Sequence, residues 1–279
     1  MIYIPLIGAI ALSVMVLFEK LGLKKNKINS NHFMVAAFLS AVVFMLFFLP
    51  FFGGVDKGIF ELKNILYFIG VIFFAVVANI CYFYAMKWEK LSTLEPVHLL
   101  EPLFVIILAS IFFSAERNTH IIIPAIIAAL ALVFSHVRKH HLNFNKYVLV
   151  GILGSFLYGV ETIFAKLVLD YFTPLSLYFF RCLFILIITA VMFRPRLTKE
   201  IKGKNWIITF VVGISWVVYK VLSYYGFIKL GVVFTTLILM LSPVLVYAFA
   251  WKFLKEKLEW RNIVAAIVII ICVLYGVLG

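Results

Sequence analysis

Long apolar runs are the feature that most constrains the fold of this chain. Each of the runs is 17 to 23 residues long, and a helix needs roughly 17–25 residues to cross the hydrocarbon core of a bilayer. The runs do not show the alternation of polar and apolar residues that is typical of strands in a lipid-facing barrel. The sequence therefore predicts an all-α membrane protein with ten transmembrane helices, at 3–21, 32–52, 65–86, 93–114, 121–137, 147–169, 174–193, 205–227, 232–253 and 261–278.

Composition excludes a water-soluble fold. Hydrophobic residues make up 65% of the chain and charged residues 13%, against about 45–50% and about 25% in soluble domains. The net charge of +13 would suggest a nucleic-acid partner in a soluble protein. Here most of the Lys and Arg lie in the predicted loops, where they contact lipid headgroups and set the orientation of the helices. We therefore expect the lipid bilayer of the plasma membrane as the partner, and no nucleic acid.

The chain contains a weak internal repeat. Its offset is 141 residues, the separation of Pro102 and Pro243, and with one residue of slippage Glu116 matches Glu256. Internal symmetry in an almost wholly apolar chain is typical of transporters that are built from two repeats around a central site. The matched prolines fall inside apolar runs, where a missing amide donor bends a helix, so we predict them as hinges.

The repeat divides the chain into residues 1–141 and residues 142–279, with five predicted helices in each half. Since five is odd, the second copy enters the membrane from the opposite side, which predicts inverted repeats and both termini on one side. The loops after odd-numbered runs hold most of the 25 Lys and Arg. The positive-inside rule places these loops in the cytoplasm and both termini outside.

Several polar residues lie within the apolar runs. An ionised group near the centre of a bilayer costs at least about 2.5–3.5 kcal/mol on insertion scales and normally faces a bundle interior or water. The substrate-binding or coupling candidates are therefore Glu101, Glu161, Arg181, Lys220, His98, Asn79, Trp216, Tyr219, Ser223 and Tyr224.

Each candidate also has a purely structural interpretation. Arg181 and Lys220 could pair with Glu161 or Glu101, and the aromatic face around Tyr219 could serve only packing. His98 could be an ordinary buried, hydrogen-bonded histidine. Residues nearer the ends of the runs, such as Glu19 and Lys166, are expected to reach the headgroups.

The sequence lacks three common nucleotide-binding and catalytic motifs. It contains no GxxxxGK[ST] phosphate loop, no GxSxG elbow and no HExxH pair, so we expect neither nucleotide hydrolysis nor an enzyme. His136, His140 and His141 border a basic loop without a carboxylate or cysteine to complete a metal site. We expect no metal and no cofactor.

The second half resembles a repeat of the EamA family. Its first helix ends in a basic residue, Lys166, and is followed by the turn Thr173-Pro174 and the aromatic-Arg pair Phe180-Arg181. The closing part, 237–279, is similar to the end of the same repeat, with Pro243 and Glu256 standing 13 residues apart.

The first half departs from this pattern. Its interval from Pro102 to Glu116 is one residue longer, Glu101 replaces the usual small residue, and His32-Phe33 is not followed by the expected arginine. The resemblance covers the whole chain and implies the drug/metabolite transporter superfamily, with ten helices, two inverted five-helix repeats and a central substrate cavity. It also implies cytoplasmic termini, against the loop charges, so the side that they face stays open.

Two functions follow as hypotheses. The first is a secondary transporter, an exporter of small polar metabolites such as amino acids, which works by alternating access. The acids Glu101 and Glu161 and the bases Arg181 and Lys220 would bind the two charges of a zwitterion. The alternative is a proton-coupled exporter of lipophilic cations, in which the bases only pair with acids. The substrate, the coupling ion and the oligomeric state stay open.

Overall fold

The structure is a computed structural model, and it describes residues 1–20, 29–88, 97, 99–136, 146–195, 203–254 and 260–278. These residues form helices and connecting turns, without a strand among them, and one isolated bridge joins Val55 to Phe172. The helices are α1 (Tyr3–Lys20), α2 (Ser30–Phe52), η2 (Lys57–Phe60), α3 (Leu62–Trp88), α5 (Glu101–Phe112), η3 (Ser114–Glu116), α6 (Thr119–His136), α7 (Lys146–Val168), α8 (Pro174–Phe193), α10 (Lys204–Lys229), α11 (Val232–Leu239), α12 (Leu241–Leu254) and α13 (Trp260–Leu278).

Seven spans in the described part of the chain are long and apolar enough to cross a membrane. Three further apolar helices are shorter, at Tyr3–Glu19, Glu101–Phe112 and Thr119–Ser135. The protein is therefore an all-α, multi-pass membrane protein. The count of ten crossings remains a prediction.

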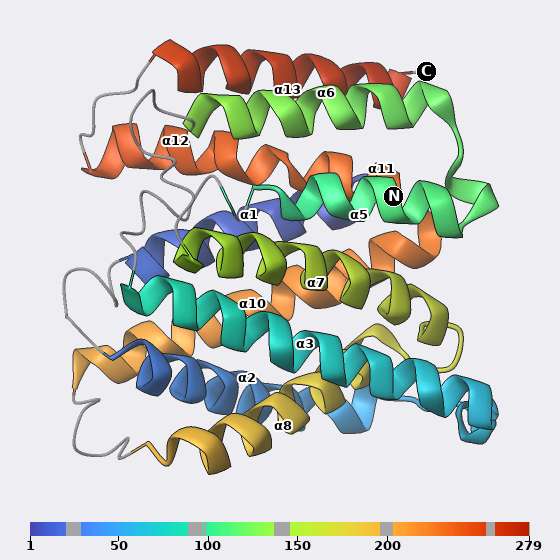
Figure 1. The fold of residues 1–279 in the computed structure, drawn as a ribbon, viewed down its shortest axis with the longest axis vertical. Helices are drawn as coiled ribbons and strands as arrows, with labels where there is room; N and C mark the ends of the chain where they lie inside the picture. The colour runs from blue at the N-terminus through green and yellow to red at the C-terminus, as the bar shows by residue number, and fades with distance from the viewer. Residues whose placement is uncertain are drawn as a thin grey trace.

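The helices run side by side as a bundle, with α6 and α13 at one edge and α2 and α8 at the other (Figure 1). The most extensive packing joins α3 to α7, α1 to α10, α6 to α13 and α2 to α8. Each of these pairs takes one helix from each half of the chain. Both chain ends lie at the same end of the bundle, on the right in Figure 1.

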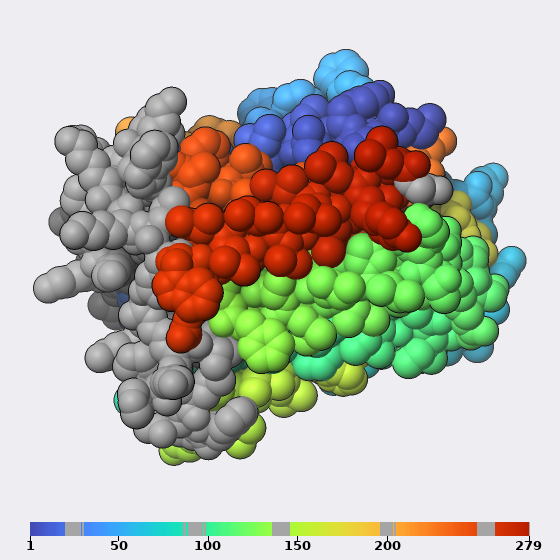
Figure 2. Space-filling model, turned by 90° about the horizontal axis from the view of Figure 1, so that it is seen from above, coloured from blue at the N-terminus to red at the C-terminus, as the bar shows by residue number. Residues whose placement is uncertain are grey.

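The outer face of α6 and α13 carries large apolar side chains. In Figure 2 the two helices lie side by side over one face of the molecule. Their exposed side chains include Ile123, Ile127, Leu130 and Phe134 of α6, and Ile263, Ile267, Ile271 and Leu274 of α13. So much exposed apolar surface is stable only against lipid.

The sequence predicted one continuous helix over 232–253, and this prediction is wrong. The run divides at Met240 into α11 and α12. The cause is Pro243, which has no N–H to donate to the carbonyl of Leu239 and whose ring crowds the preceding turn.

Pro102 is also placed differently from the prediction. It lies in the first turn of α5, behind a non-helical turn at residues 99–100, and not in a helix interior. Proline is well tolerated there because the first amides of a helix have no intrahelical acceptor. In both halves, therefore, the helix is interrupted two to three residues before the matched proline.

Candidate functional site

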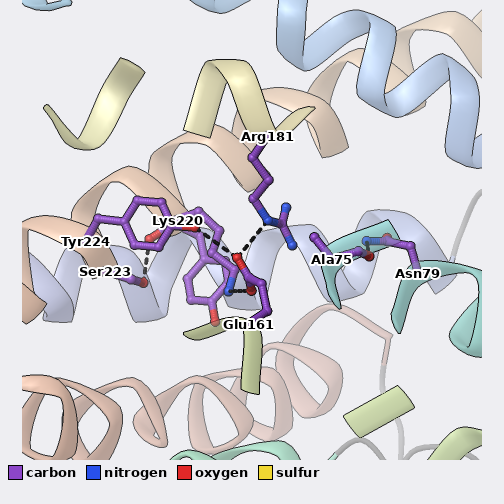
Figure 3. Close-up of polar contacts among 8 residues, drawn as sticks. Ala75, Asn79, Glu161, Arg181, Lys220, Ser223 and Tyr224 are labelled. Atoms are coloured by element: carbon purple, nitrogen blue, oxygen red, sulfur yellow. Dashed lines mark hydrogen bonds and ion pairs between the residues drawn. The ribbon is translucent and has the colours of Figure 1, made fainter. Parts of the chain in front are cut away.

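A buried ionic cluster joins α7, α8 and α10 (Figure 3). The Glu161 carboxylate lies at its centre, with Oε1 2.9 Å from Nε of Arg181. The hydroxyl of Tyr224 donates to the same oxygen at 3.3 Å. Nζ of Lys220 lies 4.0 Å from Oε2. The side chains of Glu161, Arg181 and Lys220 are 0%, 4% and 12% exposed, so the cluster is closed off from the surface.

Local sequence explains how the helices present these groups. Lys220 and Tyr224 are four residues apart on α10, so they lie on one face of that helix. Helix α8 is fixed at its start by Thr173, whose side chain accepts a hydrogen bond from the amide of Ser176, and by Pro174 at its first position. That start places Arg181 two turns into α8, opposite α7.

Aromatic rings surround the two cations. The Arg181 guanidinium lies over the ring of Tyr178 at 5.6 Å, and Nζ of Lys220 lies over Tyr219 at 5.5 Å. Tyr178 also packs edge-on against Tyr224, with ring centroids 6.3 Å apart. Such contacts help to hold cations that have lost their water.

The first half of the chain contributes one acid to this region. Glu101, at the start of α5, lies within electrostatic range of Lys220, Glu161 and Arg181. Tyr158 of α7 lies three residues before Glu161, on the same face of that helix. Three of the four ionisable candidates, Glu161, Arg181 and Lys220, therefore meet within ion-pair distance, and Glu101 lies within electrostatic range of them.

Other predicted site residues bond locally. Asn79 donates from Nδ2 to the carbonyl of Ala75 in its own helix at 2.7 Å, and Ser223 donates to the carbonyl of Tyr219 at 2.7 Å. The ring of Trp216 packs against Phe38, with centroids 4.8 Å apart. The structure thus gives these three polar groups partners outside the ionic cluster. His98 lies outside the described residues.

Glu19 and Lys166, which are expected to reach the headgroups, both have polar partners on α10, and whether they reach the headgroups stays a prediction. The Glu19 carboxylate accepts a hydrogen bond from Trp216. Nζ of Lys166 donates to the carbonyl of Phe227 at 2.7 Å, near the end of α10. In both cases a neighbouring helix offers a polar partner within reach of the side chain.

Sequence reasoning missed Tyr158 and Tyr178. Each lies three residues before an ionised residue of the cluster, Tyr158 before Glu161 and Tyr178 before Arg181. Residues three apart share a helix face. An aromatic residue three positions before a charge in an apolar run could therefore have identified both tyrosines from the sequence.

One acceptor atom of the cluster lacks a hydrogen-bond donor. Oε2 of Glu161 is buried and accepts no hydrogen bond within the described part of the chain, and Nζ of Lys220 lies 4.0 Å from it. Buried polar atoms without partners are rare in folded proteins and often mark functional sites. Among the described residues, no group of three His, Cys, Asp or Glu side chains could hold a metal ion. The arrangement is suited to binding charged groups.

The fold and the buried charges define a multi-pass membrane protein with an ionic site inside its bundle. The sequence model of the EamA-like transporter family matches residues 1–137 and 145–277. The chain therefore belongs to the EamA-like transporter family, and it is a membrane transporter of the drug/metabolite type.

A solved structure, described only as a crystal structure of a protein, has the same fold. Its TM-score is 0.79 at 15% sequence identity, over 99% of this chain and 96% of that chain. At this identity the likeness concerns the fold alone. No curated protein matches the chain.

Proposed function

We propose that this protein is a secondary transporter that exports small zwitterionic metabolites, with amino acids as the substrate class. The observation that carries the proposal is that the charged groups of the site are not equally closely paired. Glu161 and Arg181 are directly bonded at 2.9 Å, whereas Lys220 lies 4.0 Å from its nearest acid. One acid and one base are thus joined directly, and Lys220 is only loosely paired, so its ammonium can receive a ligand.

The charges divide into a positioning pair and a ligand pair. Glu161 is fully buried and also accepts from Tyr224, so it and Arg181 hold the geometry. Lys220 is the more exposed cation, and its ammonium would bind the substrate carboxylate. Glu101, at the start of α5 and within electrostatic range of Lys220, would bind the substrate ammonium.

Alternating access fits a closed-off site of this kind. The cluster must open first to one side of the membrane and then to the other, as two inverted five-helix repeats can do by rocking about a fixed centre. The interruptions before Pro102 and Pro243 are the hinges of this proposal. The ten membrane crossings, the plasma membrane location, the same-side termini and the outward direction belong to the same proposal and follow the family pattern.

A second candidate function is the export of lipophilic cations in exchange for protons. Tyr178 and Tyr219 provide aromatic faces that already hold the cations Arg181 and Lys220, and such faces also bind quaternary cations. In this case Glu101 would bind either the drug or a proton, and Lys220 would only pair with Glu161.

Thermal unfolding of the purified protein separates the two candidates, because a ligand that binds only the folded form raises its stability. The test compares free amino acids, their methyl esters, their N-acetyl forms and tetraphenylphosphonium. We expect stabilisation by free amino acids alone, lost in Lys220→Met and kept in the control Lys229→Met, which changes an exposed lysine at the end of the same helix. Stabilisation by tetraphenylphosphonium alone would establish the second candidate, and the absence of stabilisation by free amino acids would overturn the first.

A further inference from the structure

Helix α11 lies at the seam between the two halves of the chain. It packs against α1, α5 and α6 of the first half and against α10 and α13 of the second. Nearly all of its side chains are buried, namely Val232, Val233, Thr235, Thr236, Leu237, Ile238 and Leu239. Any rocking between the halves must therefore change the contacts of this helix.

Backbone features at both ends separate α11 from its neighbours. At its start, Gly231 has a φ of +88°, in the region that L side chains rarely adopt. At its end, the helix is interrupted at Met240, ahead of Pro243. Helix α11 is thus a short, rigid segment between two points where the backbone can change direction, which is the layout of a hinged element.

One carboxylate of the first half holds the start of α11. Glu116, at the end of η3, accepts hydrogen bonds from the amide of Val232 at 2.7 Å and from the amide of Val233 at 3.1 Å. A Cβ on Gly231 would lie 2.8 Å from both carboxylate oxygens, so the carboxylate fits only against glycine. Bonds from amides to an ionised acceptor at a helix N-terminus are among the strong ones.

A buried hydroxyl on the same helix opposes this arrangement. Oγ1 of Thr235 is buried and has no hydrogen-bond partner in the part of the chain that the structure describes. It packs tightly on α10, where a Cβ on Gly226 would lie 2.8 Å from it. An orphaned buried hydroxyl carries a desolvation cost, which a state with α11 displaced can relieve.

We propose that α11 is a gate of the transport path and that Glu116 is the latch that keeps it closed at the end of the bundle where the chain termini lie. This inference rests on the proposed alternating access, but it does not depend on the substrate. The latch crosses from the first half to the second, so opening at this end requires the two Glu116 bonds to break. The unpaired hydroxyl of Thr235 favours the open state of the gate.

Amide hydrogen exchange of the full chain in lipid nanodiscs tests the gate without any substrate, because exchange reports local opening. Glu116→Gln keeps the shape of the side chain and replaces one acceptor oxygen with a donor. We expect exchange across 232–239 to rise about tenfold, the change that corresponds to losing one bond to a charged acceptor. Exchange in α7 should stay unchanged. The control is Asp170→Asn, an exposed acid at the same end of the bundle, which should leave exchange in α11 unchanged.

Thr235→Val gives the opposite test. It keeps the size of the side chain and removes the orphaned hydroxyl, so exchange in α11 should slow several-fold relative to α7. A rise in Glu116→Gln that is confined to the amides of Val232 and Val233 would overturn the gate and leave Glu116 as a simple helix cap. An equal rise in every helix would do the same, since it reports general destabilisation. Failure of amino-acid binding alongside the expected exchange pattern would reject the proposed substrate and leave the gate intact.

Discussion

The two halves of the chain share an arrangement of helices but not its polar side chains. At the offset of 141 residues, the cation Lys220 of α10 falls on the neutral Asn79 of α3, and Tyr224 falls on Phe83. Glu161, Arg181, Lys220 and Tyr224 all belong to the second half. The symmetry of the fold therefore supplies the scaffold, whereas three of the four charges in the proposed site belong to the second half, and the first half adds Glu101.

Packing shows the same difference. In the first half, α2 buries Phe33, Ala36 and Ala37 in an apolar cluster with Val212 of α10. Its partner helix α8 instead carries Arg181 into the bundle. Helix α10 approaches α2 so closely that a Cβ on Gly213 would lie 2.7 Å from the carbonyl oxygen of Ala37. Small side chains bring helices together in a membrane, so α2 serves packing where α8 serves charge.

The largest stability effect should follow from breaking the buried pair of the second half. Arg181→Met leaves Glu161 buried beside only a distant cation, and we expect unfolding to become easier by about 3–5 kcal/mol. The measurement is thermal or denaturant unfolding in detergent. The double variant Glu161→Gln/Arg181→Met should recover most of the loss, because no unpaired charge then remains. A double variant as unstable as Arg181→Met alone would show that the two side chains are not coupled.

A loss of binding without a matching loss of stability is expected for Lys220→Met. Lys220 lies 4.0 Å from Glu161 and keeps some exposure, so its removal should cost little stability. Amino-acid affinity should fall at least about tenfold, the scale of one charge-assisted hydrogen bond. Binding to the purified protein, measured by calorimetry, checks this. Unchanged affinity in a folded Lys220→Met protein would show that Lys220 does not contact the substrate.

Tyr224→Phe makes the second half more like the first, where Phe83 occupies the matching position. It removes the 3.3 Å hydrogen bond to Glu161, and we expect a destabilisation of about 1 kcal/mol, the usual net value of one bond. Adding Tyr224→Phe to Glu161→Gln should cost less than the single changes predict. Strict additivity in this double-mutant cycle would mean that the hydroxyl does not support the carboxylate.

The smallest effect is expected in the first half. Asn79 bonds only within its own helix among the contacts described, so Asn79→Leu removes a local donor and its acceptor stays bonded within α3. We expect a stability change of less than about 0.5 kcal/mol and unchanged amino-acid affinity. A loss of affinity comparable with that of Lys220→Met would show that α3 of the first half also contacts the substrate.

The sequence predicted the helical class and the convergence of the charges, because the cost of a charge in a membrane leaves few alternatives. Arg181 and Glu161 could be identified as candidates because each is an ionisable residue inside an apolar run. The sequence could not show that Asn79 and Ser223 bond within their own helices, since the amide of Asn79 and the hydroxyl of Ser223 could equally face a neighbouring helix. It also placed Pro102 inside a helix, because hydrophobicity is continuous across the turn at residues 99–100.

The most direct test of the account is transport of a radiolabelled mixture of the standard amino acids in proteoliposomes. The wild-type protein should move label down its gradient faster than protein-free vesicles do. Lys220→Met should reduce the flux at least about tenfold, in line with its loss of one charge-assisted contact, while Lys229→Met should transport as the wild type does. Equal flux in the wild type and Lys220→Met, or none above protein-free vesicles, would contradict the claim that the buried charges of α7, α8 and α10 form an amino-acid site.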